Sequence, residues 1–168
     1  MTRSVSWWIF LIFGTYLCSV LSILPLNEAY QWARPQWLLM FVIFCQATYP
    51  KAFNPIFAWL IGLLLDGLLG TRLGEHALIF AVISYVTAFI GHRFPQQTMI
   101  VQMIKVLLLV CMGQILNLWF HAFEGYNPHT LFYWLGTISS CVLWPMFVIL
   151  LRFLSQLMKV ASSPSRSI

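Results

Sequence analysis

The chain has 168 residues, of which 61% are hydrophobic and only 8% are charged. Charged side chains this sparse cannot cover the surface of a water-soluble domain, and nearly every residue is needed for membrane spans and short loops. The composition therefore predicts an all-α polytopic membrane protein and excludes a further soluble domain. The net charge of +5 comes from Lys and Arg residues scattered singly at the ends of apolar runs, which indicates topology signals and argues against nucleic-acid binding.

Six apolar runs predict one transmembrane domain, a bundle of six helices over residues 1–158, followed by a disordered polar tail at residues 159–168. The predicted spans cover approximately residues 7–24, 36–49, 53–69, 77–90, 100–120 and 130–154. The four cysteines each lie inside an apolar run, without the spacing of a metal site or a disulfide framework. We therefore interpret them as small packing residues.

The first run lacks a small-residue cleavage site after it, so it predicts an uncleaved membrane anchor. Gly14, Cys18 and Ser22 recur at every fourth position of this run and form a stripe of small residues suited to close helix packing. Arg34 and Pro35 open the second run, because proline is favoured in the first turn of a helix. This run is only about 21 Å long, so it spans a bilayer only with flanking residues, local thinning or burial within the bundle.

The third run contains Asp66, the acidic residue that lies within an apolar stretch. On a helix, Asp66 shares a face with Gly62 and Gly70. An ionised Asp at mid-bilayer costs roughly 2.5–3.5 kcal/mol, so it must face a partner, a cavity or the interface. One interpretation places Asp66 near the headgroups merely as a helix end. The other makes it a structural or partner-binding carboxylate, which we expect to pair with Gln114 or Asn117 at matching depth on the fifth run.

Polar side chains recur near the end of the fifth run, where Gln114, Asn117 and His121 share one helix face. The sixth run holds Trp144 and Pro145, and the proline predicts a kink because it frees a backbone carbonyl of the preceding turn. The eight tryptophans of the chain lie mainly near span ends, as interfacial anchors do.

An even number of spans places both termini on the same side of the membrane. With the N-terminus in the cytoplasm, only Arg34 and Arg72 are external, and the other seven basic residues are cytoplasmic. Those seven are Arg3, Lys51, Arg93, Lys105, Arg152, Lys159 and Arg166. Cytoplasmic loops of membrane proteins carry an excess of Lys and Arg, so this bias predicts an N-in, C-in topology.

The sequence shows no recognisable motif for catalysis or cofactor binding. It has no Gly-rich phosphate loop, no pair of inward carboxylates, no motif that marks a nucleophile, and no polar stripe along a whole span for an ion pathway. The four His residues lie in loops or at span ends, where a solvated or hydrogen-bonded role is usual. We therefore predict a protein that is not an enzyme and that binds neither a metal nor a cofactor.

Three local signatures, in this order and spacing, resemble the MreD family of rod shape-determining proteins of Gram-negative bacteria. They are Arg34-Pro35-Gln36-Trp37, Gly62-Leu63-Leu64-Leu65-Asp66 followed by Leu73-Gly74, and Leu143-Trp144-Pro145 before Arg152. The length and the six spans extend the resemblance over nearly the whole chain. Gly67, Gly70 and Arg72 depart from the usual pattern of the family close to the Asp.

The resemblance implies a multi-pass protein of the bacterial cell inner membrane, a non-catalytic scaffold that helps maintain rod shape by organising lateral peptidoglycan synthesis. It implies MreC, MreB, RodZ, RodA and penicillin-binding protein 2 as partners, together with membrane lipid. The bundle is also similar to the substrate-capture subunits of energy-coupling-factor vitamin transporters, so the alternative is a small-molecule-binding transporter subunit. The residues expected to contact partners or neighbouring helices are Gly14, Cys18, Ser22, Arg34, Pro35, Gly62, Asp66, Gly70, Gly74, Gln114, Asn117, Trp144 and Pro145.

Overall fold

The apolar runs form helices in the computed structural model, which describes residues 2–24, 34–91, 94–123 and 134–158. The described helices are α1 (Thr2–Ile23), α2 (Trp37–Thr48), α3 (Pro55–Leu69), α4 (Glu75–Ile90), the 3-10 turn η2 (Phe94–Gln96), α5 (Met99–Phe123) and α6 (Leu135–Leu157). Each of the six predicted runs holds one α-helix. The largest differences lie at the starts of α1 and α6, at Thr2 rather than 7 and at Leu135 rather than 130. The predicted tail lies outside the described residues.

Three of the helices, α1, α5 and α6, are long and apolar enough to cross a membrane. The other three, α2, α3 and α4, are apolar but contain only 12, 15 and 16 residues. At 1.5 Å per residue they measure about 18–24 Å, against a hydrocarbon core of about 30 Å. The described part of the chain thus forms only helices, three of which are long and apolar enough to cross a membrane, and the crossing of the membrane by all six runs stays a prediction.

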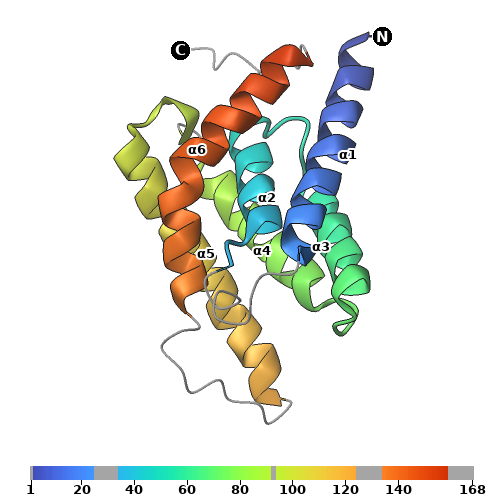
Figure 1. The fold of residues 1–168 in the computed structure, drawn as a ribbon, viewed down its shortest axis with the longest axis vertical. Coiled ribbons are helices and arrows are strands. Elements are labelled where there is room, and N and C mark those ends of the chain that lie inside the picture. Colours follow the sequence, from blue (N-terminus) through green and yellow to red (C-terminus); the bar gives the residue numbers. More distant parts are fainter. Residues whose placement is uncertain (1, 25–33, 92–93, 124–133, 159–168) are drawn as a thin grey trace.

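The helix α2 forms the centre of the bundle. Ten consecutive residues, Leu38–Ala47, are buried around its whole circumference, which is the pattern of a core helix and not of one that faces lipid. It contacts α1, α4, α5 and α6, and Figure 1 shows it between α1 and α6. Its one polar core side chain, Gln46, accepts a hydrogen bond from the Ser84 hydroxyl of α4 at 2.8 Å. Burial within the bundle therefore accommodates the shortness of the second run.

The long helices carry apolar side chains on their outer faces. Ile12 and Tyr16 on α1, Leu108 on α5, and Val142 and Phe153 on α6 are each more than 60% exposed. Soluble monomers rarely expose contiguous apolar surface of this kind. These faces are suited to lipid or to the helices of another membrane protein.

Consecutive helices run in opposite directions, so the ends of α1, α3 and α5 lie beside the starts of α2, α4 and α6. We call this end of the molecule the polar end, because Ser22, Arg34, Asp66, His76 and Asn117 gather there. The start of α1 and the end of α6 both lie at the opposite end, at the top of Figure 1. An even number of crossings requires this arrangement.

Candidate functional site

The carboxylate of Asp66 joins the end of α3 to the start of α4. The residue is fully buried, and its oxygens accept hydrogen bonds from the Thr71 hydroxyl (3.1 Å), the Gly74 N–H (2.8 Å), the His76 N–H (3.0 Å) and His76 Nδ1 (2.8 Å). The Ala77 N–H adds a longer contact of 3.4 Å. The first N–H groups of a helix have no partner inside that helix, and the N-cap Gly74 has no side chain to bind them. Asp66 therefore caps α4 from α3, with its charge at the positive end of the helix dipole.

The turn between α3 and α4 has the backbone shape that this capping requires. Gly70 (φ 67°) and Gly74 (φ 106°) adopt left-handed conformations that other residues rarely take. Gly70 is exposed and ends α3, and its N–H donates to the Asp66 backbone carbonyl. The prediction that Gly70 shares a packing face with Gly62 is therefore wrong, because the helix ends before Gly70 and this glycine serves the turn.

Gly62 lies one helical turn before Asp66 and allows the two helices to approach. A methyl group on Gly62 would lie 2.4 Å from Ala77 Cα and 2.6 Å from the His76 carbonyl oxygen. The backbones of α3 and α4 therefore touch at this point, as small residues permit in membrane helix pairs. In the Gly62-x-x-x-Asp66 pattern, the glycine admits α4 and the aspartate caps it.

The predicted pairing of Asp66 with Gln114 or Asn117 is wrong. The partners of Asp66 lie in the adjoining turn and in the first turn of α4. Gln114 instead accepts a hydrogen bond from the Thr137 hydroxyl of α6, and Asn117 lines a cavity. Within the described chain, Asp66 has the structural role that was one of the two interpretations open for it.

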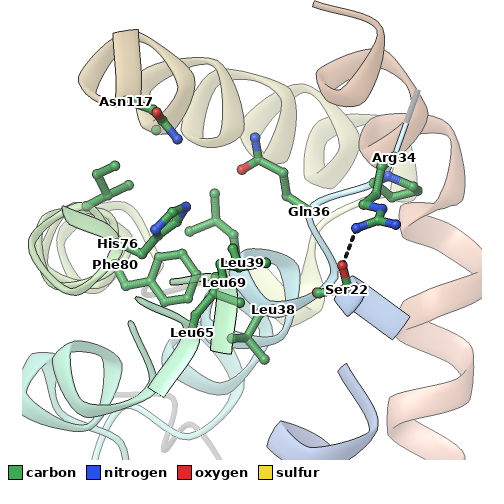
Figure 2. Close-up of a pocket in the computed structure, with 13 residues that line it drawn as sticks. Ser22, Arg34, Gln36, Leu38, Leu39, Leu65, Leu69, His76, Phe80 and Asn117 are labelled. Carbon is green, nitrogen blue, oxygen red and sulfur yellow. Dashed lines mark hydrogen bonds between the residues drawn. The ribbon is translucent and has the colours of Figure 1, made fainter. Parts of the chain in front are cut away.

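Arg34 caps a helix end of the opposite kind. Its guanidinium donates to the backbone carbonyls of Ser22 and Leu24 at the end of α1, and Figure 2 shows the bond to Ser22. This is the negative end of the α1 dipole, where a cation is stabilising. Two residues later the Gln36 N–H donates to the Ser140 hydroxyl of α6 at 2.9 Å. The segment before α2 therefore joins the end of α1 to the first turns of α6.

The small-residue stripe of α1 faces the interior of the bundle. Gly14 and Cys18 are buried, and the half-buried Ser22 donates its hydroxyl to the Cys18 carbonyl at 2.8 Å. A methyl group on Gly14 would lie 2.4 Å from the ring of Phe41 on α2. The stripe therefore lets α1 pack closely on the central helix.

Trp144 anchors α6 to the loop between α4 and α5. Its ring is fully buried and makes an edge-on contact with the ring of Phe94 in η2, with centroids 5.9 Å apart. Pro145 lies inside α6, which continues through it. The ribbon of α6 bends between its two halves in Figure 1, as the proline predicts.

Five helices line a partly open cavity of about 180 Å³ at the polar end. Figure 2 shows the polar side chains of its lining, which are Arg34, Gln36, His76 and Asn117. The rest of the lining is made by Ser22, Pro35, Leu38, Leu39, Leu65, Leu69, Ile79, Phe80 and Gly113. Pro35 precedes α2 and does not lie in its first turn, since α2 begins at Trp37. No pattern in the sequence predicts this cavity.

The described histidines are not gathered into a metal site. Within residues 2–24, 34–91, 94–123 and 134–158, no three His, Cys, Asp or Glu side chains lie close enough to share a metal ion. His76 belongs to the α3–α4 hairpin. His121 Nε2 lies 3.9 Å from Oε1 of Glu75, a residue that is only 6% exposed. His92 and His129 lie outside the described residues.

Comparison with known proteins places these features in a family. The model of the family described as rod shape-determining protein MreD matches residues 1–154. The protein of Haemophilus influenzae named rod shape-determining protein MreD is 27% identical over 163 residues, which cover 95% of this chain and 98% of that protein. No solved structure shows significant similarity to the chain. The matched region includes the Gly62–Asp66 hairpin, the Arg34 cap and Trp144, and the chain belongs to the MreD family of rod shape-determining membrane proteins.

Proposed function

We propose that the protein is a non-catalytic scaffold of the cell inner membrane, which helps maintain rod shape by organising lateral peptidoglycan synthesis. The observation that carries the proposal is the family match over residues 1–154. The site geometry supports it, because the distinctive polar side chains Arg34 and Asp66 hold helices of the chain together. Such a protein acts through the surfaces that its rigid bundle presents.

The proposed partners are MreC, MreB, RodZ, RodA and penicillin-binding protein 2. Contacts with their transmembrane helices belong on the exposed apolar faces of α1, α5 and α6, because the stripe at Gly14 is occupied by Phe41. In lipid the hydrophobic effect does not drive helix association, so close packing has to supply most of the recognition.

Outer-face variants test this assignment. Ile12→Ala with Tyr16→Ala changes α1, and Val142→Ala with Ile149→Ala changes α6, all at side chains more than 60% exposed. We expect at least one pair to reduce MreC co-purification in mild detergent and to round the cells while the purified protein melts at the wild-type temperature. Full co-purification and rod shape in both pairs would refute recognition through these two faces.

The proposed topology is six spans with both termini in the cytoplasm. The seven-to-two distribution of basic residues supports it, as does the placement of the α1 start and the α6 end at one end of the bundle. Reporter fusions at Ser163 and at Glu124 should report cytoplasm and periplasm respectively. A periplasmic signal from the fusion at Ser163 would overturn the six-span map.

The alternative function is that of a substrate-capture subunit of a vitamin-type transporter. The cavity at the polar end is the candidate substrate site for this alternative. Its volume of about 180 Å³ is below the roughly 300–1,000 Å³ typical of pockets for drug-sized ligands. The volume therefore favours the scaffold. Co-purification of a transport ATPase module in place of elongation proteins would reverse this choice.

A further inference from the structure

The cavity at the polar end contains polar atoms that the protein leaves without partners. Arg34 Nε and Asn117 Oδ1 are both buried, and neither has a hydrogen-bond partner among the described residues. The two residues lie on different sides of the same cavity in Figure 2. Unpaired buried donors and acceptors are rare in folded proteins because they are unfavourable. The cavity is therefore bordered by a donor and an acceptor whose hydrogen bonds the described protein leaves unsatisfied, and a small movement of either side chain would let a ligand satisfy them.

The charges of the lining favour an anion. Arg34 is a permanent cation, and its guanidinium is held in place by the α1 carbonyls of Ser22 and Leu24. No carboxylate side chain belongs to the described lining of the cavity. The amides of Gln36 and Asn117 add further hydrogen-bonding groups. A guanidinium beside neutral donors is well suited to the oxygens of a phosphate group.

The apolar side of the cavity indicates where such a phosphate comes from. Leu65 and Leu69 line the cavity from the last turns of α3. Leu69 is also 44% exposed and its neighbour Leu68 is 49% exposed, so this wall continues onto the outer surface of the bundle. An acyl chain would bury its own apolar surface against this wall, whereas a water-soluble phosphate has no apolar surface to bury there.

We propose that the cavity binds the phosphate of an anionic phospholipid between Arg34 and Asn117, with one acyl chain lying along Leu65 and Leu69. A volume of about 180 Å³ is many times the roughly 10–15 Å³ that a single water molecule needs, so the cavity has room for a phosphodiester headgroup. This proposal does not depend on the scaffold function, because lipid binding by the isolated protein requires none of the proposed partner proteins.

The test measures binding of phosphatidylglycerol to the purified full-length protein in non-ionic detergent, by native mass spectrometry. Diacylglycerol with the same acyl chains lacks the phosphate, and glycerol 3-phosphate lacks the chains. Arg34→Gln and Asn117→Leu change the site. Lys105→Gln is the matched control, because Lys105 also donates to a carbonyl at a helix end, that of Ile90 at 3.2 Å, but does not line the cavity.

We expect phosphatidylglycerol to bind, and diacylglycerol and glycerol 3-phosphate to bind at least about tenfold more weakly. Loss of a charge-assisted hydrogen bond in Arg34→Gln should weaken phosphatidylglycerol binding about tenfold or more. Asn117→Leu should weaken it as well while keeping the wild-type melting temperature without lipid, since Oδ1 has no partner in the described protein. Lys105→Gln should bind like the wild type.

Three results would overturn the proposal. If diacylglycerol bound as tightly as phosphatidylglycerol, the phosphate would not be what the cavity recognises. If glycerol 3-phosphate bound as tightly, the acyl chains would not contribute to binding. An equal loss of binding in Lys105→Gln would show that general charge and not this cavity holds the lipid.

Discussion

Replacement of Asp66 is the most direct test of the hairpin. Its Oδ1 accepts from the Thr71 hydroxyl and from the N–H and ring of His76, and its Oδ2 accepts from the N–H groups of Gly74 and Ala77. An asparagine that keeps the Oδ1 contacts presents its NH₂ group to the Gly74 and Ala77 donors. Each buried donor left unpaired costs about 1–3 kcal/mol, and the Ala77 contact at 3.4 Å is weaker than the Gly74 bond at 2.8 Å. Asp66→Asn should therefore lower the free energy of unfolding by about 2–4 kcal/mol, less than two full bonds would cost.

Asp66→Leu should be more severe, because it leaves all of these donors without an acceptor and removes the charge at the start of α4. We expect a loss of at least about 4 kcal/mol, which few single substitutions reach. An isolated intramembrane hydrogen bond of average strength, about 0.6 kcal/mol, predicts instead that Asp66→Asn is tolerated. The stability of Asp66→Asn therefore distinguishes a capping carboxylate, whose loss is costly, from an isolated hydrogen bond, whose loss is tolerated.

Thermal unfolding in detergent can be followed with a thiol-reactive dye, because the free thiols of Cys18 and Cys45 are fully buried. A loss of 2–4 kcal/mol in a protein of this size lowers the melting temperature by roughly 5–15 °C. Thr71→Val is the control, since it removes only one donor from the same carboxylate and should cost about 1 kcal/mol. If Asp66→Leu melted at the wild-type temperature, the capping role argued for this carboxylate would be untenable.

Two further predictions concern glycines and use the same assay. Gly62→Ala should destabilise the protein by about 1–3 kcal/mol, because the added methyl meets the backbone of Ala77. Gly67→Ala on the same helix meets nothing within 4 Å and should stabilise it by about 0.5–1 kcal/mol, so equal effects of the two would contradict the close crossing. Gly14→Leu should lower the melting temperature through a clash with Phe41; an unchanged melting temperature with lost partner binding would show that this stripe faces a partner.

The sequence predicted the helices and the importance of the Gly62 and Asp66 face, because helix periodicity alone places these two residues together. It did not predict the acceptor role of Asp66 toward His76, because that contact depends on a turn with two left-handed glycines, and backbone angles of this kind are not visible in a hydropathy pattern. Matching depth pointed to α5, yet depth does not determine which neighbour a side chain faces. A useful signal was available, since Asp66 is followed within one short turn by a helix start that lacks a capping side chain.

The cavity could not be predicted from the sequence for a related reason. Its walls come from five helices, and its volume depends on their mutual positions. The sequence analysis placed Asn117 near Asp66, and the structure brings Asn117 and the Asp66 partner His76 to the same cavity. Asn117 and Asp66 thus lie at the same end of the bundle, while the predicted contact between their side chains is wrong.

Three charged residues of the described chain, Arg34, Asp66 and Lys105, satisfy backbone groups at helix ends. Backbone groups at a helix end have no partner inside the helix, and within a membrane each unsatisfied group costs several kcal/mol. Asp66 caps the start of α4, Lys105 donates to Ile90 at its end, and Arg34 caps the end of α1. Because these caps come from neighbouring elements, they also fix the helices against one another. The exposed apolar side chains of α1, α5 and α6 take no part in these caps, so under the proposed function they remain available for contact with lipid and with partner helices.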